Sequence, residues 1–487
     1  MGTDNNLQSA AFSGVLWKLI EKFSIQIFAF VQGIILARLL APSDYGLVAM
    51  TGIFFSISCL LSDAGFSTAL VRKENRSELD YSTVFITNIS LSFFFCTLLC
   101  VGSGWISDFY HEPLLKDIVC VNALFLFLGS FLDVQNTRLS IYLKFKQQSI
   151  INFIASIFIG IIALLMAFTG FGVWSLVIPS GLAIPIRAFL LWRVQHWWPK
   201  ISFSIESFHE FFSFGSKIML TAIIKAAYNN LFSLIIGKKF TATDLGYYTR
   251  ANGYSTLPAD TIGNTLGSIS YPILSKIQND DEYLAKAYRR MISLSAYVLF
   301  PIMFGMAVLA RPLVIVLVTE KWESCIIYLQ ILCFAVMWNP IHSLNYNLLQ
   351  TKGRADLRLR VEIAQKILCI LMLIVTVPFG ILYMCFGSVL VSVLSLIINT
   401  YYTGKMINVG LWAQLRDMLP AFFYSLTMYV LVWTVIQFIS SMPLQLVAGV
   451  FVGGGYYLFI SKITKSEDLV YLVTLVKNSL FKRGGIG

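Results

Sequence analysis

The sequence predicts an all-α integral membrane protein with fourteen transmembrane helices, arranged as two parallel six-helix lobes followed by two further helices. Apolar residues make up 57% of the 487 residues and charged residues only 13%, against about 25% in a soluble domain. Nearly uncharged windows of about 18 residues or more, long enough to cross a bilayer, recur along the whole chain. A short motif also recurs, because PSDYG around Asp44 is followed 200 residues later by ATDLG around Asp244. These observations argue against a soluble fold and indicate an internal duplication.

Charges, glycines, prolines and turn residues set the limits of the apolar windows. The span at 244–273 is the least apolar of them, because it contains Arg250, Pro258 and Asp260. The predicted spans are 12–38, 44–69, 82–106, 116–136, 148–169, 172–193, 211–237, 244–273, 289–318, 325–349, 361–378, 381–404, 418–440 and 444–461.

Lysine and arginine are shared unequally between alternate loops. The loops on one side hold 24 of them, with Arg187 counted in that group, and the loops on the other side hold six. Because cytoplasmic loops are enriched in positive charge, we expect the richer side, and with it both termini, to be cytoplasmic. The net charge of +11 is spread over seven segments rather than gathered on one face, so it does not indicate nucleic acid binding.

The linker RVQHWWPKISFSIESFHEF separates the two sets of six helices. Because six is even, the second set enters the membrane in the same direction as the first. The predicted domains are an N-lobe at 1–206, a C-lobe at 207–407, and helices 13 and 14 with a cytoplasmic tail at 408–487. The motif copies lie at the outer connection between the first two helices of each lobe. There we expect the aspartates to cap the next helix and Gly46 and Gly246 to permit the turn.

The first helix of each lobe carries polar residues that a membrane disfavours. In the first lobe Lys18, Lys22 and Gln26 recur at every fourth position and share one face, with Glu21 beside them. In the second lobe Lys217, Thr221 and Lys225 do the same. An ionisable group near the bilayer centre costs about 2.5–3.5 kcal/mol on insertion scales, so these lysines should face a partner or a wet cavity.

More modest interpretations of these charges remain open. Lys18 and Lys217 could extend to the cytoplasmic surface, and Lys22 with Glu21, or Lys225 with Asp260, could form a structural ion pair. Arg250 could cap the outer mouth of a cavity, and Asp63 could accept a hydrogen bond at a helix end rather than carry a proton.

An excess of positive groups between two lobes favours an anionic ligand, because a guanidinium can hold phosphate with two hydrogen bonds and lysines supply mobile charge. The candidate substrate-binding residues are Lys18, Lys22, Gln26, Lys217, Lys225 and Arg250. The candidate ion-coupling residues are Glu21, Asp63 and Asp260.

The sequence offers no catalytic or metal-binding pattern. Its eight cysteines are scattered through apolar segments and are typical of small buried side chains. The longest outer loops, near 105–118 and 311–325, contain no paired carboxylates, no metal cluster and no glycine-rich phosphate loop. We therefore expect neither a catalytic residue nor a bound metal or cofactor, and a glycan polymerase or glycosyltransferase is disfavoured.

Four runs in this order, ARLLAPSDYGLVAM, LLSDAGFSTALVRK, DLGYYTRANGYSTLPAD and ISYPILSKIQND, resemble the Wzx-like polysaccharide transporters of the multidrug/oligosaccharidyl-lipid/polysaccharide superfamily. The similarity covers about residues 10–460 and is greatest to the colanic-acid-type exporters. The resemblance implies a MATE-like fold in the bacterial inner membrane. It also implies a flippase that moves undecaprenyl-pyrophosphate-linked oligosaccharides to the periplasmic leaflet by alternating access.

In that family helices 1, 2, 7 and 8 line the cavity, which implicates Lys18, Lys22, Asp63, Lys217, Lys225, Arg250 and Asp260 here. The expected partners are the polyprenyl-linked glycan and membrane lipids, with a glycan polymerase and a chain-length regulator as further candidates, and the protein is expected to act as a monomer. Coupling to a proton gradient, a sodium gradient or the membrane potential stays open, since no sodium site can be matched. A drug/cation antiporter of the same superfamily is the alternative, although it would need more acidic than basic groups in the cavity.

Overall fold

The computed structural model describes the chain at residues 21–22 and 24–482, and every regular element in these residues is a helix. The chain divides into two compact units, Met1–Thr249 and Arg250–Gly487. This division follows from which residues pack together. The boundary expected between residues 206 and 207 follows instead from the repeat in the sequence, and it stays a prediction.

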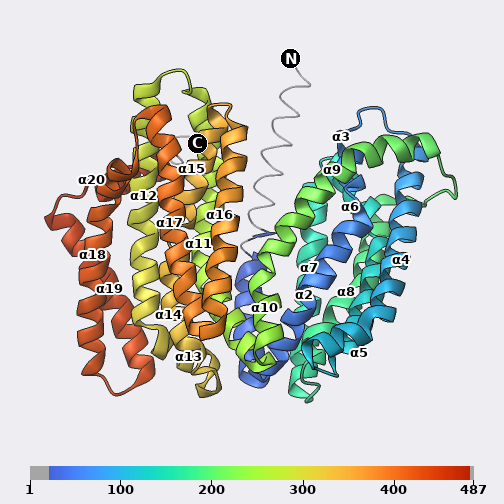
Figure 1. The fold of residues 1–487 in the computed structure, drawn as a ribbon, viewed down its shortest axis with the longest axis horizontal. Helices are drawn as coiled ribbons and strands as arrows, with labels where there is room; N and C mark the ends of the chain where they lie inside the picture. The colour runs from blue at the N-terminus through green and yellow to red at the C-terminus, as the bar shows by residue number, and fades with distance from the viewer. Residues whose placement is uncertain (1–20, 23, 483–487) are drawn as a thin grey trace. The chain divides into compact units, whose positions relative to one another are not determined.

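The first unit is a bundle of long helices, in which α4 packs on α5 and α7 packs on α8 (Figure 1). α11 (Ala242–Lys276) begins in this unit and continues into the second. The other helices are Ser24–Leu39, α2 (Pro42–Asp63), α3 (Phe66–Arg72), α4 (Glu78–Tyr110), α5 (Leu115–Ser130), α6 (Asp133–Ile141), α7 (Phe145–Phe168), α8 (Trp174–Gln195), α9 (Ile205–Asn229) and α10 (Leu231–Lys239).

In the second unit the long helix α12 packs against α14, α15 and α18. Its elements are α12 (Asp281–Val308), α13 (Ala310–Val318), the short η1 (Glu320–Trp322), α14 (Cys325–Val336), α15 (Asn339–Thr351), α16 (Ala355–Thr376), η2 (Val377–Phe379), α17 (Ile381–Ile407), α18 (Leu411–Gln437), α19 (Met442–Ile463) and α20 (Glu467–Lys482). α20 was not predicted from the sequence. It is joined to α12 by a hydrogen bond of 2.7 Å that Ser293 Oγ donates to the Asp468 carboxylate.

Among the described residues, ten helices are long and apolar enough to cross a membrane, and twelve if each of two bent pairs counts as one span. The predicted all-helical, multi-span architecture is thereby confirmed. The spans at 116–136 and 211–237 are not the continuous helices expected, because α5 with α6 and α9 with α10 each bend by 43°. At both breaks a polar side chain bonds to the helix backbone: Ser130 Oγ donates to Phe127 O at 2.7 Å and Asn230 Nδ2 donates to Ala226 O at 2.8 Å.

The repeated motif behaves partly as predicted. Asp44 accepts a hydrogen bond from the amide of Ala41 at 2.9 Å, and Asp244 accepts one from the amide of Thr241 at 3.2 Å, so each aspartate caps its helix. The glycines are not in the turns, which corrects the prediction. They lie inside α2 and α11, where a Cβ on Gly46 would lie 1.7 Å from the carbonyl oxygen of Ala242.

The close approach is reciprocal, since a Cβ on Gly246 would lie 1.9 Å from the carbonyl oxygen of Pro42. Pro42 and Ala242, like Gly46 and Gly246, are 200 residues apart. The two motif copies therefore cross backbone to backbone as a self-complementary pair, the arrangement seen at two-fold interfaces. This crossing explains why both copies need glycine.

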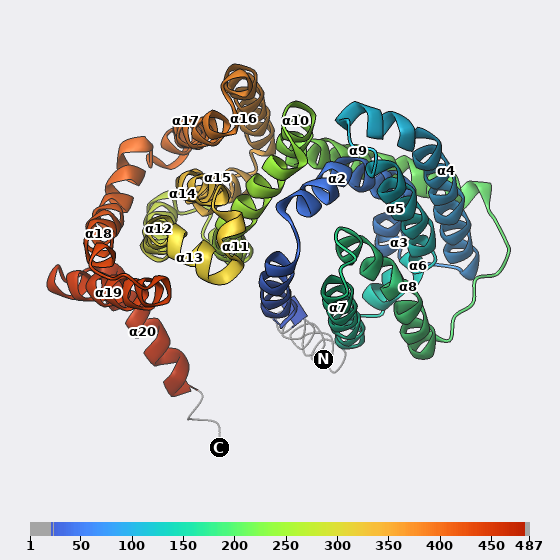
Figure 2. The same cartoon turned by 90° about the horizontal axis from the view of Figure 1, so that it is seen from below.

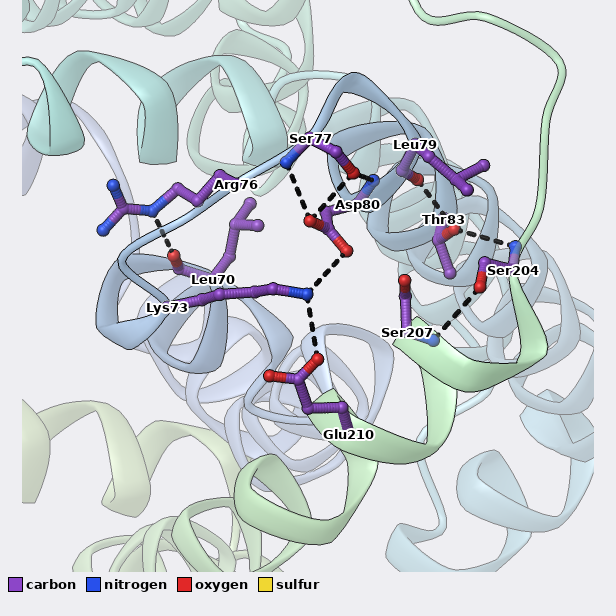
Figure 3. Close-up of polar contacts among 10 residues, drawn as sticks. All are labelled: Leu70, Lys73, Arg76, Ser77, Leu79, Asp80, Thr83, Ser204, Ser207 and Glu210. Carbon is purple, nitrogen blue, oxygen red and sulfur yellow. Dashed lines mark hydrogen bonds and ion pairs between the residues drawn. The ribbon is translucent and has the colours of Figure 1, made fainter.

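The start of α9 is anchored to the α3–α4 connection (Figure 3). Lys73 Nζ bridges Asp80, on the first turn of α4, at 3.0 Å and Glu210, on α9, at 2.9 Å. Burial opposes the charge on Lys73, but the hydrogen bonds to Glu210 and Asp80 outweigh it and raise the pKa of Lys73. This ion network fixes the helix that carries two of the candidate substrate-binding residues.

Candidate functional site

Lys217, Thr221 and Lys225 form a polar row along α9, and all three side chains are exposed at the surface of the first unit. Helical geometry places Lys217 about 18 Å and Lys225 about 30 Å along the helix from its start at Ile205. Because α9 and α10 together form a candidate membrane span, both lysines lie within apolar surroundings along the chain. The three residues therefore share one face of α9, as predicted, and their side chains are exposed on it.

The first helix of the chain supplies the other candidates of this unit. Lys22 is exposed, and Gln26 is half-buried. Lys18 lies outside the described residues. The carboxylate of Glu21 accepts hydrogen bonds from Ser149 Oγ at 2.6 Å and from Asn152 Nδ2 at 2.8 Å, both on α7. α7 thus positions the Glu21 carboxylate, a contact that the sequence analysis did not predict.

Arg250 is the first residue of the second unit. Its guanidinium carbon lies 5.3 Å from the ring centre of Trp322 and 5.5 Å from that of Tyr254, so two aromatic rings hold it by cation–π contacts. Trp322 is fully buried. Asp260 lies ten residues after Arg250 in α11, and its side chain is exposed. The convergence of Arg250 and Asp260 with the lysines of the first unit on one chamber stays a prediction.

Asp63, at the end of α2, is a hydrogen-bond acceptor for the next helix. It accepts from Ser67 Oγ at 2.5 Å and from the Ser67 amide at 3.3 Å. Asp63 thus accepts a hydrogen bond at a helix end, one of the two roles that the sequence left open for it. Its side chain also lines a cavity of about 440 Å³ within the first unit, where Asp133 and Arg187 are further lining residues.

This cavity was not predicted from the sequence. The assignment of Arg187 to the cytoplasmic loop charges was wrong, because Arg187 lies inside α8, eight residues before its last residue, Gln195. The signal was present in the sequence: Arg187 and Asp133 both fall inside apolar windows. In the described part of the chain, no cluster of three or more histidine, cysteine, aspartate or glutamate side chains could hold a metal ion.

The chain matches a family profile described as "Polysaccharide biosynthesis protein" over residues 35–327. The teichuronic acid biosynthesis protein TuaB of Bacillus subtilis (strain 168) is 24% identical to it over 480 residues, covering 97% of this chain and 98% of that protein. The lipopolysaccharide biosynthesis protein WzxC of Escherichia coli (strain K12) is 23% identical over 407 residues, covering 81% of each chain.

A solved structure of the lipid II flippase MurJ, in an inward closed conformation, has the same fold. It superposes with a TM-score of 0.76 at 15% identity, covering 94% of this chain and 100% of that one. At this identity the likeness shows the fold alone. It confirms the predicted all-helical, multi-span membrane architecture, and the two sequence relatives confirm the resemblance drawn from the four sequence runs.

Proposed function

We propose that this chain, which belongs to the polysaccharide biosynthesis protein family, flips a lipid-linked oligosaccharide from one leaflet of the membrane to the other. The family is one of multi-pass membrane transporters and not of enzymes. The named roles of TuaB and WzxC in glycan biosynthesis support a glycan cargo, and the lipid II flippase offers a precedent in the same fold.

The cargo we propose is an oligosaccharide repeat unit linked to undecaprenyl pyrophosphate. The exposed row of Lys217, Thr221 and Lys225 on α9 is the observation that carries this proposal. Two ammonium groups inside a candidate membrane span are costly against lipid and favourable against a pyrophosphate in a hydrated chamber. Lys22 on the first helix and Arg250 on α11 would add charge to the same headgroup, with Lys18 and Gln26 as further contacts.

The mechanism we propose is alternating access by a frame of fourteen spans, in which Ser24–Leu39 and α11 add to the twelve that composition identifies. The headgroup enters the chamber while the polyprenyl tail stays in lipid. Moving an anion outward across a negative-inside potential is favourable by about 2.3 kcal/mol per charge per 100 mV, so the potential assists export. We place both termini in the cytoplasm of a bacterial cell, on the lysine and arginine distribution.

The test is flipping by the purified chain in vesicles that hold the lipid-linked oligosaccharide in one leaflet. Vesicles with the natural sequence should expose the glycan on the opposite side, where a glycosidase added outside digests it. The Lys217→Ala, Lys225→Ala double variant should flip about tenfold more slowly, the loss expected for about 1.4 kcal/mol of headgroup binding.

Lys239→Ala is the matched control, because Lys239 is exposed at the end of α10 and outside the polar row. It should flip at the natural rate. Undiminished flipping by the double variant would remove the lysine row from the site. No flipping by the natural sequence, together with saturable efflux of organic cations from the same vesicles, would support the drug antiporter instead.

A further inference from the structure

We propose that the cavity of the first unit binds one monovalent cation, a proton or a sodium ion, between Asp63 and Asp133. The residues that line the cavity come from α2, α3, α4, α5, α6 and α8, helices of this unit that pack against one another (Figure 2). Its residues come from far apart in the chain, with Asp63 at the end of α2, Asp133 at the start of α6 and Arg187 within α8.

The charges around the cavity leave a net charge of minus one. Among its described lining residues, from whichever helix they come, the titratable or charged side chains are Cys59, Asp63, Asp133 and Arg187. Asp63 and Asp133 line the same cavity, so the negative charges of the two carboxylates repel each other. Like charges that share an apolar site are relieved when one takes up a proton or when a cation binds between them. One monovalent cation makes the cavity neutral.

Arg187 does not remove this need. Within the described part of the chain its guanidinium forms no ion pair, and its Nε is buried without a hydrogen-bond partner. The Asp133 carboxylate likewise accepts no hydrogen bond from a described residue. Asp63, in contrast, has one oxygen bound to Ser67. Acceptor capacity therefore remains on both carboxylates.

Two buried hydroxyls also line the cavity without a partner. Ser62 is 3% exposed and Ser92 is 0% exposed, and neither Oγ has a hydrogen-bond partner among the described residues. Buried polar atoms are nearly always paired, so two unpaired hydroxyls beside two carboxylates indicate a bound species. Carboxylate, amide and hydroxyl oxygens, the last two supplied by Asn122, Asn136 and these serines, suit a hard cation or a hydrated proton.

The existence of this site is independent of the proposed function, and only its use to drive flipping rests on it. A binding experiment on the purified, full-length chain in lipid nanodiscs therefore tests it without transport. Binding of radioactive sodium measures how many sodium ions each chain holds. Infrared difference spectra between alkaline and acidic buffers measure proton binding, through the carbonyl stretch of a protonated carboxylic acid.

For the natural sequence we expect one sodium ion or one carboxyl proton per chain. Asp133→Asn should bind neither, because Asp63 and Arg187 then cancel. Asp117→Asn is the matched control, since Asp117 is exposed on α5, which also lines the cavity, and it should keep the natural stoichiometry. Size-exclusion chromatography of each variant establishes that it is folded.

Charge rescue separates cation binding from a merely structural role. Arg187→Gln leaves two negative charges and should bind two monovalent cations per chain. Adding Asp133→Asn to Arg187→Gln leaves Asp63 alone and should restore one. If the number of bound sodium ions changes across these variants as predicted, the bound cation is sodium. If the carboxyl bands change as predicted and no sodium binds, the bound cation is a proton. A stoichiometry of zero in the natural chain, or one that does not change across the series, would overturn the proposal.

Discussion

The buried polar core of the second unit and the cavity of the first unit both place polar side chains inside apolar bundles, but they differ in pairing. The polar core consists of Tyr288, Asn345, Thr403 and Gln414, all fully buried. Gln414 and Asn345 exchange two amide hydrogen bonds of 3.3 Å, and Gln414 Nε2 also donates to Thr403 Oγ1 at 2.9 Å. In the cavity, Asp133, Arg187, Ser62 and Ser92 lack such partners among the residues that the structure describes.

The difference shows how the two regions contribute. The polar core joins α12, α15, α17 and α18 by hydrogen bonds. Its side chains bond to one another rather than to a ligand, so its role is structural. The cavity retains unpaired acceptors and a net negative charge, which a fold would not keep for packing alone. Pairing, rather than burial or polarity, separates the structural cluster from the candidate ligand site.

Replacing Gln414 by leucine should have the largest effect on stability. It leaves buried Asn345 and Thr403 without their amide partner, which should cost about 2–4 kcal/mol. Thermal unfolding in detergent measures the loss. Gln437→Leu, at the exposed end of the same helix, is the control and should leave the unfolding midpoint unchanged. Equal midpoints for the two variants would show that the polar core does not hold the helices.

Replacing Arg187 by glutamine should have an intermediate effect that depends on pH. Two carboxylates then repel each other with no compensating charge, so stability should fall by about 1–3 kcal/mol in alkaline, sodium-free buffer. Acidification protonates a carboxylate and sodium neutralises one, so stability should rise as the pH falls or as sodium is added. Arg193→Gln, exposed near the end of α8, should show neither dependence. A loss that is independent of pH and sodium would contradict the charge account.

Replacing Ser92 by alanine should have the smallest effect, within about 0.5 kcal/mol, because an unpartnered hydroxyl contributes little to the folded state. Thr403→Val sharpens the comparison, since it removes a partnered hydroxyl and should cost about 1–2 kcal/mol. Chemical unfolding of both variants gives the two values. A Ser92→Ala loss as large as that of Thr403→Val would mean that the hydroxyl has a structural partner.

Local features of this protein were predictable from its sequence. Hydropathy located the membrane-crossing segments but neither α20 nor the two breaks, and the caps at Asp44 and Asp244 followed from short-range rules. The glycine of each motif was assigned to a turn, because sequence gives no sign of which backbones will cross. Only the fold shows that Gly46 meets Ala242 and that Gly246 meets Pro42.

The cavity could be predicted only in pieces. Asp63 was singled out as a candidate ion-coupling residue, whereas Arg187 was counted among the cytoplasmic loop charges although it falls inside the predicted span 172–193. Their proximity depends on how α2, α6 and α8 pack, and no periodicity within one helix encodes it. Glu21 shows the same limit, since its partners Ser149 and Asn152 lie on a helix more than 100 residues away in sequence.

The central claim is that the lysines of α9 face water inside the membrane, where an anionic headgroup can reach them. Cysteine accessibility tests it most directly, with Lys217→Cys and Lys225→Cys placed separately in a chain whose natural cysteines are replaced. Val101→Cys, 71% exposed on the apolar surface of α4, is the lipid-facing control. A membrane-impermeant thiol reagent should label positions 217 and 225 but not 101, and pyrophosphate should slow both reactions. Labelling at neither lysine position would contradict a hydrated cationic chamber.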